Sequence, residues 1–119
     1  MHSTAPALTL SPRTLSTGEL DAWLTAHLRH WQLDALAPAL RTVARELADN
    51  ALRHGATPAR ATLTRLPSAR LRLAVTDAGP GFDPTTPGPG LRRVAARTTA
   101  WGVDPLPLGH RVWADLTLA

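Results

Sequence analysis

The spacing of apolar residues along the chain predicts helices first and alternating strands later. In the first part, apolar side chains recur at intervals of three and four residues, which is the period of a helix. These residues are Leu20, Trp23, Leu24, Leu28 and Trp31. Ser16 and Glu19 have the spacing of a capping box, in which each residue satisfies a free amide of the other at a helix start. We therefore predict a helix over about residues 17–31.

A second helix is predicted from Leu36 to His54, again from one apolar stripe. The stripe consists of Leu36, Leu40, Val43, Leu47 and Ala51. Gly55 follows at the position where a left-handed residue commonly ends a helix. A third helix is predicted over residues 91–101, directly after Gly90.

The remaining segments alternate apolar and polar residues, which predicts strands. Residues 59–66 and 70–77 form one expected hairpin, joined by Pro67–Ala69. Residues 103–119 predict a second strand pair, with Val112, Ala114, Leu116 and Leu118 on one face. A short strand is also expected at residues 7–10. The order of elements suits one sheet covered by helices on a single face.

Composition narrows the class of protein without naming a function. The chain has 119 residues, of which 44% are hydrophobic and 18% charged, so we expect a single globular domain over residues 1–119. There is no cysteine, which excludes disulfides and thiolate metal sites. The first sixteen residues contain no long apolar run, so we expect no signal peptide, no membrane partner and a cytoplasmic location.

Arginine supplies all of the positive charge that is counted here. The formal net charge is +4, and all 13 basic residues are arginine. A P-loop and a eukaryotic-type protein kinase each need a lysine on the phosphates, so both are excluded. The arginines are spread along the chain and show no nucleic-acid reader motif, so we expect no direct nucleic-acid partner.

The stretch Arg45–Gly55 puts unusual chemistry on one side of the second predicted helix. Glu46 and Asn50 are four residues apart and project from the same side. A carboxylate can accept a proton from an attacking hydroxyl, and an amide oxygen can coordinate Mg²⁺. Asp49, Arg53 and His54 add further polar groups. A solvated helix face would have the same composition, so this stretch alone does not distinguish a functional site from a solvated face.

Two glycine-rich segments follow. Asp77 ends a predicted strand, where its carboxylate could accept a hydrogen bond from an exocyclic amine such as that of adenine. Gly79 and Gly81 would let a flat ring approach the backbone. Gly88–Leu91 precedes the third helix, where free amides bind anions. The alternatives are a tight turn at Asp77 and an ordinary helix start after Gly88.

The order and spacing of these three motifs favour a nucleotide-binding site over the simpler alternatives. Glu46-x-x-x-Asn50, then Asp77-x-Gly79-x-Gly81, then Gly88-x-Gly90-Leu91 resembles the triple signature of the GHKL ATPases. The sequences ELADNALRHG, LRLAVTDAGPGF and GHRVWADLTL resemble segments of the small bacterial anti-sigma-factor serine/threonine kinases. The similarity covers about residues 8–118. It implies an α/β two-layer sandwich of the Bergerat fold, with a mixed, largely antiparallel sheet and helices on one face.

The resemblance also implies a role for each matching residue. Glu46 would be the general base, and Asn50 the magnesium ligand. Asp77 would accept the adenine amine between Gly79 and Gly81. Gly88, Gly90 and Leu91 would form the phosphate-binding turn. Arg53 and His54, one turn beyond Asn50, could reach the phosphates, but the family motif does not require them. The implied cofactors are ATP and Mg²⁺.

Departures from the family pattern bear on activity. The segment Phe82–Pro87 is short for a lid over ATP, and Pro89 removes one amide donor from the phosphate turn. His110 and Arg111 lie where the closing strand of the family often carries a threonine that supports adenine.

Two functions remain open. The first is a kinase that phosphorylates Ser or Thr of an anti-anti-sigma (antagonist) protein and thereby regulates a sigma factor, with a homodimer possible. The second is a catalytically weak, nucleotide-gated interaction module.

The other large or basic side chains have simpler expected roles. We expect Trp23, Trp31, Trp101 and Trp113 to serve packing. We expect Arg92, Arg93 and Arg97 to lie on a solvated helix face.

Overall fold

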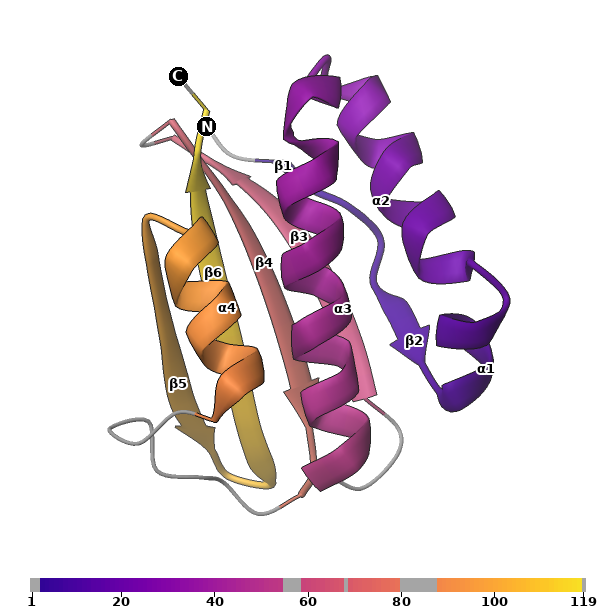
Figure 1. Cartoon of the computed structure of the whole chain (residues 1–119), viewed down its shortest axis with the longest axis vertical. Helices are drawn as coiled ribbons and strands as arrows, with labels where there is room; N and C mark the ends of the chain where they lie inside the picture. The colour runs from indigo at the N-terminus through magenta and orange to yellow at the C-terminus, as the bar shows by residue number, and fades with distance from the viewer. Residues whose placement is uncertain (1–2, 55–58, 68, 80–87, 119) are drawn as a thin grey trace.

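The chain forms one sheet whose helices lie on a single face (Figure 1). The structure, a computed structural model, describes residues 3–54, 59–67, 69–79 and 88–118. The strands are β1 (Ser3–Thr4), β2 (Leu8–Leu10), β3 (Ala59–Leu66), β4 (Arg70–Asp77), β5 (Ala100–Leu106) and β6 (Gly109–Thr117). The helices are α1 (Pro12–Ser16), α2 (Glu19–His30), α3 (Ala37–His54) and α4 (Pro89–Arg97), with a 3₁₀ turn at Asp34–Leu36.

The sheet has the strand order β1-β3-β4-β6-β5, and β2 pairs with β3 beside β1. Every pairing among the described strands is antiparallel. The expected mixed sheet is therefore wrong in this respect. The reason is topological: α4 carries the chain from β4 to β5, but β6 inserts between those two strands and runs antiparallel to both.

The core lies between the sheet and the helices, as the apolar pattern predicted. From α3, the side chains of Leu40, Val43, Leu47 and Ala51 are buried, and Leu36 is partly buried before the helix begins. From the sheet, the alternating residues Leu71, Leu73, Val75, Val112, Ala114 and Leu116 face them. The predicted strands 59–66 and 70–77 are confirmed to the residue.

The start of the first predicted helix is wrong. The capping box is formed by Ser11 and Thr14 instead of Ser16 and Glu19, and it opens the short helix α1. The hydroxyl of Ser16 donates to the carbonyl of Arg13 inside that helix. Gly18 then adopts a left-handed φ of 81°, which separates α1 from α2.

The third helix also differs from its prediction. It begins at Pro89, with Gly88 as its N-cap, and ends at Arg97. Thr98 is extended, and the backbone amide of Thr99 donates to the carbonyl of Asp115 at 2.8 Å. Pairing with β6 therefore takes the chain into β5 before the predicted helix end at residue 101.

The tryptophans pack within the chain, as expected. Trp23, Trp31 and Trp101 are partly buried against the core. The indole N–H of Trp23 donates to the carbonyl of Pro6 at 2.9 Å, which fastens the N-terminal segment to α2. Trp113 lies on the other face of the sheet, where the guanidinium of Arg72 is 4.3 Å from its ring centre.

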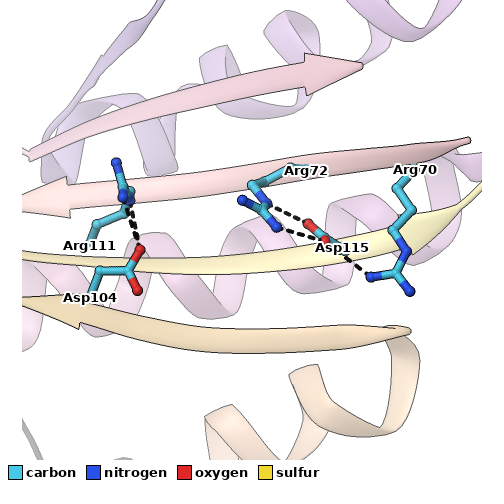
Figure 2. Close-up of polar contacts among 5 residues, drawn as sticks. All are labelled: Arg70, Arg72, Asp104, Arg111 and Asp115. Carbon is cyan, nitrogen blue, oxygen red and sulfur yellow. Dashed lines mark hydrogen bonds and ion pairs between the residues drawn. The ribbon is translucent and has the colours of Figure 1, made fainter. Parts of the chain in front are cut away.

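The helix-free face of the sheet carries two groups of ion pairs (Figure 2). The Asp115 side chain is 1% exposed, and it accepts hydrogen bonds from Nε and Nη2 of Arg72 at 2.7 and 3.0 Å. Arg70 approaches the same carboxylate at 3.5 Å. The second pair, Arg111 and Asp104 at 2.9 Å, is much more exposed. None of the helices in the described part of the chain is both long and apolar enough to cross a membrane.

Candidate nucleotide-binding site

Three chain segments meet at one end of the molecule: the end of α3, the end of β4 and the start of α4 (Figure 1). The tip of the β5–β6 hairpin lies at the same end. This end therefore holds the C-terminal part of the Glu46–Asn50 helix, the Asp77 strand end and the Gly88–Gly90 turn.

Glu46 and Gly90 are in close contact across α3 and α4. A Cβ atom added to Gly90 would lie 2.6 Å from Oε2 of Glu46, closer than real Cβ contacts allow. Only glycine therefore fits at this position without moving the carboxylate. The structure thus brings together the expected base and one expected phosphate-binding glycine.

Arg93 also contacts Glu46, which the sequence interpretation did not anticipate. Its Nε donates to Oε1 of Glu46 at 2.6 Å. This hydrogen bond, together with the negative charge of Glu46, raises the pKa of Arg93. Arg92, Arg93 and Arg97 are all exposed, as expected of a solvated helix face, but the ion pair between Arg93 and Glu46 was not expected. Helical spacing alone could not show this pair, because it depends on how α4 packs against α3.

Asn50 lies one turn beyond Glu46 on α3 and is partly buried. Its Nδ2 atom is buried and has no hydrogen-bond partner among the described residues. A half-turn of the amide exchanges its oxygen and nitrogen, so this position can present an oxygen to a cation or an N–H to a phosphate. Buried polar groups are normally paired, so an orphaned amide here fits a site that a ligand completes.

No side chain of the described residues caps the start of α4. Gly88 is the N-cap and has no side chain to satisfy the first-turn amides, and the first turn contains no acidic residue. Pro89 has no N–H, which leaves the amides of Gly90 and Leu91. Leu91 is buried and anchors the turn in the core. Such a helix start attracts anions.

Asp77 is buried and engaged by its own neighbours. Its Oδ1 accepts from the backbone N–H of Gly79 at 2.8 Å, and its Oδ2 lies 3.4 Å from Nε2 of His110. Nδ1 of His110 in turn lies 3.3 Å from the carbonyl of Gly79. His110 faces Asp77 across β4 and β6. The sequence marked His110 only as a replacement for threonine, whereas the structure gives it a direct contact with the expected adenine acceptor.

Arg53, another expected site residue, is engaged elsewhere on α3. Arg53 is ion-paired with Asp49 one turn earlier on α3, and both side chains are exposed. Gly81, the lid segment Phe82–Pro87 and the expected C-cap residue Gly55 lie outside the described residues. Those parts of the prediction stay predictions.

Two cavities border residues of the candidate site. One, of about 600 Å³, adjoins Asp77 and is lined by Arg60, Thr76, Asp77, Ala78, Leu106, Pro107 and Leu108. The other, of about 470 Å³, adjoins Glu46 and is lined by Pro12, Leu15, Ser16, Arg45, Glu46, Asp49 and Arg93. They share no lining residue, so each borders a different part of the expected site.

The described residues contain no group of three or more histidine, aspartate or glutamate side chains that could hold a metal ion. A magnesium ion at Asn50 would therefore depend on oxygens from phosphate and water, as is usual for Mg²⁺. Comparison with known proteins adds no assignment: no family model matches this chain, and no curated protein matches it.

Proposed function

We propose that this chain binds Mg·ATP at the cluster of Glu46, Asn50, Asp77 and Gly88–Leu91, and transfers the γ-phosphoryl group to a protein hydroxyl. The main support is the contact between Glu46 and Gly90, because it joins the expected base to the expected phosphate turn. The orphaned amide of Asn50 and the uncapped start of α4 support it further.

In this proposal each group has one task. The amides of Gly90 and Leu91 bind phosphate oxygens, and Asn50 holds the magnesium ion. The bound Mg²⁺ supplies neutralising charge on the phosphates. Glu46 accepts the proton of a serine or threonine hydroxyl as its oxygen bonds to the γ-phosphorus and the bond to ADP breaks. Phosphoryl transfer needs mainly positioning and charge stabilisation, which these few groups can provide.

The proposed protein substrate is an anti-anti-sigma antagonist, and the proposed regulated partner is a sigma factor. Both follow from the resemblance of the three motifs to the anti-sigma-factor kinases. A homodimer is proposed on the same ground.

Nucleotide binding is tested first. A thermal-shift titration with Mg·ATP and Mg·GTP compares the two bases under the same conditions. We expect Mg·ATP to stabilise the protein by about 2.7 kcal/mol at a hundredfold excess over its Kd, and Mg·GTP much less. Asn50→Ala should remove most of the stabilisation, whereas Asp49→Ala, an exposed neighbour on the same helix, should keep it. Equal stabilisation by both nucleotides would contradict the role of Asp77.

Catalysis is tested with labelled ATP and candidate antagonist proteins. We expect label on the antagonist with the unaltered chain and none with Glu46→Ala, while Glu46→Ala still binds Mg·ATP. Transfer that persists in Glu46→Ala would show that another group accepts the proton.

A second function is favoured by one observation. The pair between Arg93 and Glu46 occupies an oxygen of the expected base. A chain in which this pair persisted with ATP bound would be a nucleotide-gated interaction module with little or no transfer. Binding of Mg·ATP without label on any antagonist would support this alternative.

A further inference from the structure

We infer that Arg93 is a phosphate-binding residue that Glu46 holds in the nucleotide-free chain, and that it exchanges the carboxylate for phosphate oxygens when a nucleotide binds. The inference rests on the proposed function, because it assumes that phosphates occupy the start of α4. It adds a residue that the three sequence motifs do not contain.

The position of the guanidinium supports this inference. Its Nε is bonded to Oε1 of Glu46, while its Nη2 lies 3.9 Å from the point that a Cβ on Gly90 would occupy. One side chain thus spans the carboxylate and the phosphate turn. Arg93 follows Gly90 by three residues, and helix side chains lean towards the N-terminus of their helix. Its ordinary direction therefore points to the uncapped amides of Gly90 and Leu91.

Exposure makes the exchange feasible. The Arg93 side chain is 53% exposed, whereas that of Glu46 is 20% exposed. Ion pairs that face water contribute little to stability, so releasing this one costs little. A triphosphate carries more negative charge than one carboxylate, and the guanidinium fork fits both groups.

Among the described residues, Arg93 is the cation that the structure places beside Gly90. The chain has no lysine. Arg53 is ion-paired with Asp49 on the exposed side of α3. Arg97 is one turn further from the phosphate turn and donates to the carbonyl of Arg93.

The exchange would couple nucleotide binding to the readiness of the base. In the structure, Oε1 of Glu46 accepts from Arg93 and Oε2 is held against Gly90. When Arg93 turns to phosphate, Oε1 becomes free to accept a hydroxyl proton. Glu46 would then be available only while phosphates are in place.

Calorimetric titrations with Mg·ATP and with adenosine test the exchange. We expect Arg93→Ala to weaken Mg·ATP binding about tenfold or more, which is the effect of losing a charge-assisted hydrogen bond, and to leave adenosine binding unchanged. Arg92→Ala is the matched control, because it removes the same charge from an exposed neighbour on α4. It should change the Kd for Mg·ATP by less than about twofold.

Glu46→Ala tests the competition itself. Freed from the carboxylate, Arg93 should bind phosphate more readily, so the affinity for Mg·ATP should rise a few-fold. The double variant Glu46→Ala with Arg93→Ala should then bind Mg·ATP as weakly as Arg93→Ala alone. Arg93→Lys keeps the charge but loses the guanidinium fork, so its affinity for Mg·ATP should lie between those of the unaltered chain and Arg93→Ala. This variant replaces Arg93→Ala in the test if Arg93→Ala does not fold.

The outcomes separate the inference from the proposed function. If the unaltered chain binds Mg·ATP but Arg93→Ala binds it equally well or better, Arg93 only braces Glu46 and the exchange is wrong. Additive effects of the two substitutions would also overturn the exchange. If the unaltered chain binds neither Mg·ATP nor adenosine, the proposed function fails and the inference fails with it.

Discussion

At the scale of single residues, burial decides which charges matter for stability. Asp115 and Asp104 both pair with arginine on the helix-free face (Figure 2). The Asp115 side chain is 1% exposed and that of Asp104 is 43% exposed. Removing the partner of a desolvated charge is costly, whereas an ion pair in water contributes little.

We therefore expect Asp115→Asn to destabilise the fold by about 2–3 kcal/mol, below the full cost for a wholly buried pair because its arginines remain partly hydrated. Asp104→Asn is the matched control and should cost less than about 1 kcal/mol. Urea unfolding of both variants measures the difference. Equal losses would show that burial of Asp115 does not govern the pair.

Arg72, which pairs with Asp115, should keep its proton throughout the pH range in which the protein is studied. The hydrogen bond from Arg72 to Asp115 raises the pKa of Arg72 above an already high value. A raised pKa adds stability below the unfolded pKa and loses it only as pH rises through the folded one. We therefore expect the difference in unfolding free energy between the unaltered chain and Arg72→Ala to stay constant from about pH 7 to pH 10. A difference that shrinks across that range would mean that Arg72 loses its proton there.

Gly90 gives a residue-scale test of the phosphate turn. Gly90→Ala places a methyl group in the proposed phosphate turn, against Oε2 of Glu46. We expect weaker Mg·ATP binding by calorimetry, because the methyl group keeps phosphate away from the amides of the turn. Stability should change little, because the carboxylate is the end of a flexible side chain that can move aside and alanine favours the helix. Gly18→Ala is the control for the loss of a glycine, because Gly18 lies outside the candidate site, at the start of α2, and a Cβ there meets nothing within 4 Å. Its Mg·ATP affinity should be close to that of the unaltered chain.

At the scale of elements, the β5–β6 turn is fixed by one glycine against the end of β4. Gly109 has a φ of 153°, and a Cβ there would lie 1.9 Å from the carbonyl oxygen of Asp77. A backbone atom cannot move aside as a flexible side chain can. The turn therefore holds the Asp77 end of the candidate site in place.

Gly109→Ala should destabilise the protein by about 3 kcal/mol or more, because it combines backbone strain with a steric clash. Gly18→Ala separates the two causes. Gly18 also has a positive φ, of 81°, but a Cβ there would meet no atom within 4 Å. It should cost about 1 kcal/mol by thermal or urea unfolding. Similar losses in both variants would show that strain alone accounts for the effect.

How far the sequence predicted these elements depends on whether the signal was local. Alternation gave β3 and β4 to the residue, because each has one face in the core. The end of α4 was missed because pairing of Thr99 with Asp115 is a long-range contact. For the same reason the sequence indicated Glu46 and Gly90 as site residues but not the contact between Glu46 and Arg93.

At the scale of the whole molecule, both edges of the sheet have features that hinder pairing with another chain. On one edge, β5 contains Pro105, which has no amide to donate, and Asp104, which carries charge. Both features discourage pairing with another chain. On the other edge, β1 and β2 cover β3, and the N-terminal segment packs through Leu10 at 1% exposure.

Removing residues 1–10 should therefore lower the free energy of unfolding by more than the truncation of one side chain does. It uncovers the edge of β3 and the core beneath Leu10, and it removes the hydrogen bond from Trp23 to Pro6. We expect a lower urea midpoint and concentration-dependent light scattering, because an open strand edge pairs with other chains. Leu10→Ala is the control: it should lose about 2–4 kcal/mol but stay monodisperse, because β2 still covers the edge. Scattering by Leu10→Ala at the same concentrations would show that the lost core packing, not the bare edge of β3, causes the association.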